Sequence, residues 1–192
     1  MIKIAIIISG RGSNMEAIIK SCQAKKIDGN VELVISNKED AKGLAIAKKL
    51  GIKTAAKKTE DEIVAEVDKI NPDLICLAGY MKIVSPKFIQ AYKNKIINIH
   101  PALLPAFPGL HVQKKALEHG VKYSGCTVHF VDEDCDTGPI IKQAVVPVLE
   151  GDTEESLSKR ILKEEHKIYY EAIQLFAQNK LSIEGRIVHV KE

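Results

Sequence analysis

Residues 95–109 read KIINIHPALLPAFPG, and the isoleucines at the start of this segment indicate a short strand. Side chains two positions apart on a strand share a face, so Asn98 and His100 point the same way. Pro101 ends the strand, and the later prolines hold the chain in a non-helical path. Because open parallel sheets bind ligands at the carboxyl ends of their strands, this position suits a functional site. An equally open interpretation is a strand end whose asparagine and histidine bond only to nearby backbone.

Strands and helices alternate over the first hundred residues. Apolar or β-branched runs predict strands at residues 2–9, 31–36, 52–55, 74–78 and 96–100. Helical patterns fall between them, beginning near residue 15 and covering residues 40–50, 59–70 and 85–92. In the second of these helices Asp40 is the expected cap and Gly51 the stop. This alternation is typical of an α/β fold, a doubly wound, mostly parallel twisted sheet with helices on both faces.

The pattern changes in the second half of the chain. After a helix over residues 112–118, strands at 123–131 and 139–148 follow each other with no helix between them. They predict a hairpin, and therefore antiparallel strands at the C-terminal end of the sheet. A long helix is expected over residues 153–179, capped by Asp152 or Thr153. The remaining residues 182–191 are interpreted as a short edge strand or a tail.

Composition indicates an ordinary globular chain that forms one domain. Its 192 residues are 45% hydrophobic and 28% charged, and the net charge of +3 is too small to indicate a nucleic-acid surface. The four cysteines lack metal-like or redox-like spacing, which favours a reducing, cytoplasmic location. The opening apolar run is too short to span a membrane and lacks a cleavage site. The six histidines show no ligand spacing, so no metal is expected.

A glycine turn follows the first strand. Residues 10–14 read GRGSN and lead directly into a helix, an arrangement whose free backbone N–H groups suit an anion. The turn does not match the dinucleotide fingerprint, because Met15 stands where a third glycine is needed. It does not match the P-loop either, because Gly-Lys-Ser/Thr is absent. These residues fit a phosphate, and they fit an ordinary strand-to-helix turn equally well.

Three further features could line a site, and each has a plainer interpretation. The loop over residues 79–84 is rich in apolar atoms and could hold a flat aromatic ligand, or it packs on its own core. The segment 132–138 carries four carboxylates in seven residues, which is usual for a solvated turn and lacks EF-hand spacing. Glu165 falls on the apolar stripe of the last helix, where a carboxylate needs a partner. That partner is a ligand amine or hydroxyl, or a lysine at the edge of the core.

Several motifs in order along the chain resemble the folate-dependent formyltransferases, and within them the enzymes that formylate glycinamide ribonucleotide. The first is Asn98-x-His100-Pro101-x-Leu103-Leu104-Pro105, followed by Pro108-Gly109-Leu110-His111. The others are Ser9-Gly10-Arg11-Gly12-Ser13-Asn14, Leu77-Ala78-Gly79-Tyr80-Met81-Lys82-Ile83, and Val128-His129-Phe130 with Asp136-x-Gly138-Pro139. The resemblance extends over nearly the whole chain, and agreement among several motifs is far more specific than any one of them.

This resemblance implies transfer of a formyl group from 10-formyltetrahydrofolate, the co-substrate, to the primary amine of glycinamide ribonucleotide, without a metal. It implies that Asn98, His100 and Asp136 are catalytic, with His111 and His129 in support. The ribonucleotide is then expected at Gly12, Ser13, Asn14, Met15, Glu16 and Glu165. The folate is expected at Met81, Lys82, Ile83, Val84, Asn98, Asp132, Glu133, Asp134, Cys135 and Asp136. Residues 1–192 are taken as one formyltransferase domain, with a phosphate-binding half at 1–100 and a folate-binding, catalytic half at 101–192.

The chain departs from the family pattern at two places. Ala102 stands where a serine is common, and the segment 54–60 is shorter than in many relatives, where an arginine reaches the folate tail. Lys57 or Lys58 is the available replacement. Methionyl-tRNA formyltransferase and formyltetrahydrofolate hydrolase are the related alternatives, but each carries a further domain for which this chain has no room. A non-catalytic nucleotide-binding module is the alternative from another class. Small-molecule substrates, no nucleic acid or membrane partner, and a monomer or homodimer are expected.

Overall fold

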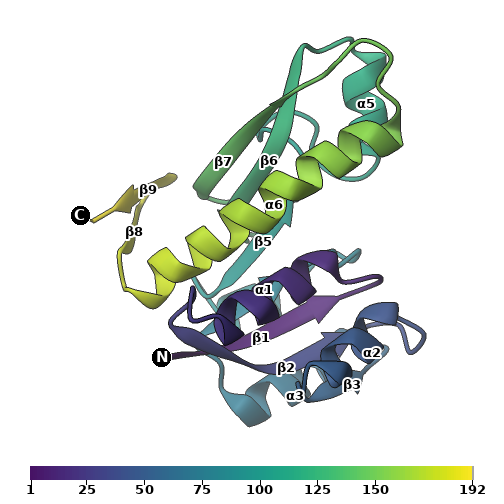
Figure 1. The fold of residues 1–192 in the computed structure, drawn as a ribbon. Coiled ribbons are helices and arrows are strands. Elements are labelled where there is room, and N and C mark those ends of the chain that lie inside the picture. Colours follow the sequence, from purple (N-terminus) through teal and green to yellow (C-terminus); the bar gives the residue numbers. More distant parts are fainter. Residues whose placement is uncertain (192) are drawn as a thin grey trace.

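A single nine-stranded sheet organises the computed structural model, which describes residues 1–191 (Figure 1). The strands are β1 (Ile2–Ile8), β2 (Gly29–Ser36), β3 (Thr54–Ala56), β4 (Leu74–Leu77), β5 (Ile96–His100), β6 (Tyr123–Phe130), β7 (Ile140–Pro147), β8 (Leu181–Glu184) and β9 (Ile187–Val190). The helices are α1 (Ser13–Gln23), α2 (Lys42–Lys49), α3 (Glu60–Ile70), α4 (Pro86–Ala91), α5 (Val112–Glu118) and α6 (Glu154–Ala177).

The sheet is parallel in its first half and mixed beyond it, where β6 and β8 run antiparallel to their neighbours but β7 pairs parallel with β9. Its order is β3-β2-β1-β4-β5-β6-β7-β9-β8, and the five strands from β3 to β5 run parallel to one another. Strand β6 pairs antiparallel with both β5 and β7. The predicted doubly wound sheet with an antiparallel C-terminal end is therefore confirmed. The change of direction lies beside β5, the strand that carries Asn98 and His100.

Two cores cover the two faces of the sheet. Alternate residues of β1 belong to different cores. Ile4, Ile6 and Ile8 pack under α1, α2 and α6, whereas Ile7 packs under α3 and α4. Both faces of β1 are thus buried from Ile4 onward, which explains the apolar run that follows Lys3. Figure 1 shows α6 lying across the sheet from β5 to β7, with α1 beside it. Since α6 contacts α1, β6 and β7, it joins the parallel part of the sheet to the antiparallel part.

Local details differ from the sequence-based expectations at two places. Ala41, not Asp40, is the N-cap of α2, and no side chain caps that helix. Residues 182–191 form most of a β8–β9 hairpin at the edge of the sheet rather than one strand or a tail. Thr153 is the cap of α6, and it accepts a hydrogen bond from the N–H of Ser156. The strand and helix content and the Thr153 cap were therefore predictable, but the cap of α2 and the final hairpin were not.

The four cysteines are free thiols, and Cys76 and Cys126 are buried in the core. Across residues 1–191, no helix combines the length and the apolar character needed to cross a bilayer.

Candidate active site

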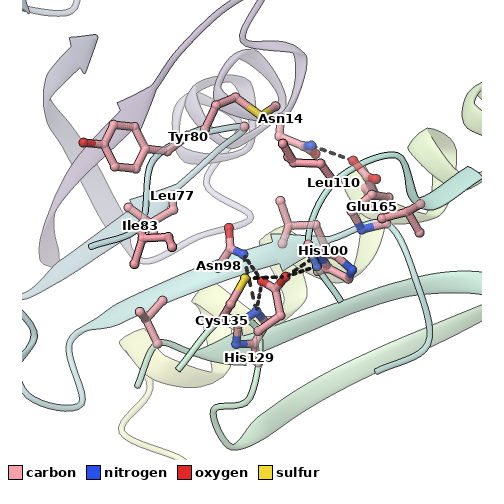
Figure 2. Close-up of a pocket in the computed structure, with 18 of the residues that line it drawn as sticks. Asn14, Leu77, Tyr80, Ile83, Asn98, His100, Leu110, His129, Cys135 and Glu165 are labelled. Atoms are coloured by element: carbon pink, nitrogen blue, oxygen red, sulfur yellow. Dashed lines mark hydrogen bonds and ion pairs between the residues drawn. The ribbon is translucent and has the colours of Figure 1, made fainter. Parts of the chain in front are cut away.

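A cavity of about 610 Å³ opens where β4 and β5 end. Its wall combines the loop after β4, the end of β5, the loop after β6 and one side of α6 (Figure 2). The residues expected in a site that line it are Asn14, Met81, Lys82, Ile83, Val84, Asn98, His100, His111, His129, Asp132, Asp134, Cys135, Asp136 and Glu165. Residues from before and after position 100 share this wall, so neither half of the chain forms the cavity alone.

Asn98, His100 and Asp136 converge on one side of this cavity. Asp136 Oδ1 accepts a hydrogen bond from Asn98 Nδ2 at 3.4 Å, and Asp136 Oδ2 lies 3.3 Å from His100 Nδ1. Asn98 and His100 share a face of β5, as their spacing predicted, while Asp136 arrives from the loop between β6 and β7. The plainer interpretation of a strand end bonded only to nearby backbone is therefore insufficient.

Both ring nitrogens of His100 face hydrogen-bond acceptors. Nε2 lies 2.9 Å from the carbonyl oxygen of Phe107, and Nδ1 faces the carboxylate of Asp136. A neutral imidazole has one N–H and can satisfy only one of them, whereas an imidazolium donates to both. Burial lowers the pKa of His100, and the charge of Asp136 opposes that effect. The charge state of His100 therefore depends directly on Asp136.

The Asp136 carboxylate is held ionised by its surroundings. Burial raises its pKa, but the nearby His129 ring, the N–H of Gly109 and the charge of His100 outweigh burial and hold the pKa well below its usual range. The Gly109 N–H donates to Oδ2 at 2.9 Å. Asp136 adopts a left-handed backbone conformation, with φ of 57°, which a non-glycine residue adopts at some cost. Strain at this position is consistent with a functional constraint on the carboxylate.

The amide of Asn98 is oriented by two neighbours. Its Nδ2 lies 3.3 Å from His129 Nε2 as well as 3.4 Å from Asp136 Oδ1. His129 is buried, and its Nδ1 lies 2.8 Å from the carbonyl oxygen of Phe130. With Nδ1–H donating to that carbonyl, Nε2 is free to accept from Asn98. Figure 2 shows the amide oxygen of Asn98 turned away from both neighbours.

A buried threonine fixes the turn that follows His100. Thr127 is the partner of His100 in the β5–β6 pairing. Its hydroxyl donates to the carbonyl oxygen of Ala102 at 2.6 Å and accepts from the N–H of Leu104 at 3.1 Å. It also accepts from Gln143 Nε2 at 2.9 Å. These bonds hold the turn against β6, and Ala102 contributes to them through its backbone, so the absent serine hydroxyl is not required there.

The glycine turn lines a second cavity of about 360 Å³ next to the first. Gly12 is the N-cap of α1 with φ of 75°, so the N–H groups of the first helical turn point out of the helix end. Gly12, Ser13 and Asn14 line this cavity, together with Lys38. The side chains of Met15 and Glu16 do not: Met15 is fully buried in the core and Glu16 pairs with Lys20 at 2.6 Å.

Glu165 is paired with Asn14 across the interface of α6 and α1. Asn14 Nδ2 donates to Glu165 Oε2 at 2.7 Å, and each residue is 8% exposed. Burial raises the pKa of Glu165, and the hydrogen bond from Asn14 opposes that rise. Asn14 Oδ1 is buried without a hydrogen-bond partner, and Asn14 lines both cavities. Asn14 thus fills the place that we considered for a lysine, and its oxygen, which has no partner among residues 1–191, can accept a further hydrogen bond.

The remaining five residues considered for the site divide between the cavity wall and its surroundings. Glu133 is exposed outside the larger cavity, where it accepts a hydrogen bond from Gln90. His111 is exposed at the start of α5 and lines the cavity, whereas His129 contacts Asn98 and Asp136 directly. Lys57 and Lys58, considered for a folate tail, pair with Glu66 and Glu39 at 3.4 Å each.

Some residues of the two cavities were not predicted as site residues. They include Lys38, Ser158 and Leu162. The carbonyl of Phe107, which faces His100, was not predicted either. Lys38 follows the end of β2, and the rule that ligands bind at the carboxyl ends of parallel strands could have found it. The Phe107 carbonyl had no sequence signal, because any residue supplies a carbonyl.

Comparison with known proteins agrees with this geometry. Residues 2–173 match the formyl transferase family description. The chain is 43% identical over 189 residues to phosphoribosylglycinamide formyltransferase of Escherichia coli, covering 94% of this chain and 89% of that one. The structure of glycinamide ribonucleotide transformylase 1 from Symbiobacterium toebii superposes with a TM-score of 0.98 at 49% identity, covering 100% and 95% of the two chains.

A third relative matches the chain over a similar length. Phosphoribosylglycinamide formyltransferase from Anaplasma phagocytophilum has a TM-score of 0.96 at 43% identity, over 100% of this chain and 94% of that one. The matched region includes the strand with Asn98 and His100, the loop with Asp136 and the helix with Glu165. On these grounds the chain belongs to the formyl transferase family.

Proposed function

We propose that this enzyme transfers the formyl group of 10-formyltetrahydrofolate to the primary amine of glycinamide ribonucleotide, a step of purine biosynthesis. Formyl transfer is the reaction of the family, and the named relatives act on this acceptor. The observation that carries the proposal is the convergence of Asn98, His100 and Asp136 beside a glycine turn suited to phosphate. The two adjoining cavities match a reaction that joins two substrates.

The folate is assigned to the larger cavity. Its volume is within the range of about 300–1,000 Å³ typical of small-molecule sites. Leu77, Ile83 and Val84 give its wall apolar surface suited to a flat ring, and Asp132 and Asp134 supply acceptors for ring N–H groups. Cys135 and the Met81–Lys82 segment complete this wall. Glu133 lies outside this cavity, and we assign it a structural role in its loop rather than a contact with the folate.

The acceptor is assigned to the glycine turn and the Asn14–Glu165 pair. Backbone N–H groups at the start of α1 and the positive end of the helix favour the phosphate, and Lys38 adds a positive charge. Glu165 attracts the amine end, and the free Asn14 oxygen accepts a hydrogen bond from it. We therefore assign phosphate recognition to residues 1–100. The folate cavity and the catalytic groups come from both sides of residue 100.

Each catalytic side chain has a distinct task. As the amine attacks, negative charge builds on the formyl oxygen, and a donor placed there contributes roughly 10²–10³ in rate. Asn98 supplies this donor when its amide turns one N–H from Asp136 towards the cavity. Cationic His100 gives a proton to the leaving nitrogen of the folate when its ring turns one N–H from Phe107 towards the cavity, a contribution of roughly 10²–10⁴. The formyl carbon is already an activated acyl group, so the scheme requires no metal.

Asp136 acts by charge. Its low pKa keeps it ionised, and the ionised carboxylate favours the imidazolium form of His100. The same carboxylate accepts a hydrogen bond from the water that carries the proton away from the attacking amine. His129 supports both partners by contacting Asn98 and Asp136 from the buried side.

An assay of the purified protein tests this proposal. With 10-formyltetrahydrofolate as donor, glycinamide ribonucleotide should be formylated, whereas water and methionyl-tRNA should not be used. His100→Ala should fold normally and lose formyl transfer. Transfer to methionyl-tRNA, release of formate alone, or full activity of His100→Ala would contradict the assignment. The expectations of a cytoplasmic location and of a monomer or homodimer stay predictions.

A further inference from the structure

The hydroxyl of Tyr169 on α6 lies between two strands that form the site. It is 2.9 Å from the carbonyl oxygen of Leu77 and 3.2 Å from the carbonyl oxygen of Ile97. Leu77 is the last residue of β4, and the Ile97 carbonyl belongs to the peptide group that leads into Asn98. The hydroxyl therefore bridges β4 and β5 where their pairing ends, at Leu77 and Asn98.

This hydroxyl is a permanent donor. Tyr169 is 1% exposed and is among the largest fully buried side chains. Burial raises its pKa well above the usual range, so the hydroxyl keeps its proton under all ordinary conditions. Its single proton is shared by two main-chain carbonyls in the core, where solvent cannot replace it.

Tyr169 also shares a helix face with the acceptor site. Glu165 lies four residues before it on α6, and side chains with that spacing are neighbours on a helix. Glu165 accepts the hydrogen bond from Asn14 at the start of α1. One face of α6 thus carries both Glu165, at the proposed site of the formyl acceptor, and Tyr169, which holds the peptide group before Asn98.

We propose that Tyr169 is a positioning residue for formyl transfer. It fixes the peptide group before Asn98, and with it the distance from the Asn98 amide to an amine held at Asn14 and Glu165. This inference rests on the proposed function. An error of about 1 Å in such a placement costs on the order of 10² in rate. Because Tyr169 is enclosed in the core and touches neither cavity, its loss should reduce kcat and leave both KM values unchanged.

Tyr169→Phe tests this inference, and Tyr92→Phe is the matched control. Tyr92 is also buried and donates its hydroxyl to Asp68 at 2.6 Å, but it packs in the core on the opposite face of the sheet. Tyr169→Phe should lower kcat about tenfold or more, with both KM values within about twofold of wild type. Tyr92→Phe should lower the melting temperature while keeping kcat within about twofold. An unchanged kcat in Tyr169→Phe, or an equal fall in both variants, would overturn the inference.

A measurement without substrates separates this inference from the proposed function. Amide hydrogen exchange in residues 96–100 should accelerate in Tyr169→Phe and stay unchanged in Tyr92→Phe. If wild-type protein transfers no formyl group, the proposed function is wrong, and exchange alone decides whether Tyr169 holds β5. Equal exchange in Tyr169→Phe and wild type would show that β5 does not need the hydroxyl, which refutes the positioning role.

Discussion

The carboxylate of Asp136 lies 3.3 Å from the imidazole of His100, Oδ2 to Nδ1, although a helix and a whole strand separate them in the sequence. On its other side the same imidazole faces the carbonyl oxygen of Phe107 at 2.9 Å. The ring is thus enclosed by two acceptors, and only its cationic form satisfies both. The chemistry assigned to His100 therefore depends on a charge supplied by another loop.

Replacing Asp136 by Asn should shift the pH range of activity. Burial lowers the pKa of His100, and the charge of Asp136 counteracts that effect. Without this charge the pKa of His100 falls further, so the imidazolium is lost at a lower pH. The alkaline limb of the kcat–pH profile should move to lower pH, and an NMR titration of the His100 ring should follow it. Asp61→Asn, at an exposed position, should leave both curves in place, and an unmoved alkaline limb in Asp136→Asn would disprove this role.

Asn98→Ala should lower kcat by roughly 10²–10³, because it removes the donor assigned to the formyl oxygen. Both KM values should change little, since the interaction is made mainly in the transition state. Steady-state kinetics with each substrate varied in turn measures this separation. The exposed Asn30 gives a control, Asn30→Ala, which should retain wild-type values. A purely KM effect in Asn98→Ala would assign the amide to substrate binding instead.

Glu165→Gln should weaken the binding of glycinamide ribonucleotide, the formyl acceptor, and leave the binding of the folate, the formyl donor, unchanged. Glutamine keeps an oxygen that accepts from Asn14, but it removes the negative charge that attracts the amine. We expect KM for glycinamide ribonucleotide to rise about tenfold, the size expected from loss of one charge-assisted contact, with KM for the folate unchanged. Glu164→Gln removes a neighbouring carboxylate outside the cavity and should have no such effect. An equal change in the two KM values would argue against Glu165 as an acceptor contact.

Thr127→Val should destabilise the fold by about 2 kcal/mol, since it leaves buried backbone groups at Ala102 and Leu104 without their partner. Urea unfolding followed by circular dichroism measures this change. Thr54→Val, in the edge strand β3, is the comparison and should be nearly neutral. The loosened turn should also reduce kcat, because it begins directly after His100. Equal stability of the Thr127→Val and Thr54→Val variants would contradict the role of the Thr127 hydroxyl in holding this turn.

The sequence alone predicted the parts of the fold that depend on periodicity. The apolar run of β1 and the absence of a helix between β6 and β7 were enough to predict a mixed sheet. The end of α2 nearest the site was not predictable in detail, because Asp40 has a capping side chain but Ala41 occupies the cap position. Whether a polar residue caps a helix depends on backbone angles that local composition does not determine.

For the site, spacing placed Asn98 and His100 on one face but gave no information about Asp136. Only the family motifs connected that residue to the other two. The partner of Glu165 could not be deduced either, since Asn14 lies far away in sequence and contacts it only after α1 and α6 pack together. Contacts of this kind depend on tertiary packing, which a linear pattern does not record.

The bond between Asn14 and Glu165 joins the first helix of the chain to the last. A ribosome synthesises α1 early and α6 near the end, so a nascent chain has the glycine turn long before it has the carboxylate that completes the acceptor site. The proposed acceptor site therefore forms only once α6 has packed against α1. A truncation that removes α6 should yield a fragment that cannot retain the acceptor, even with every residue of the phosphate turn intact.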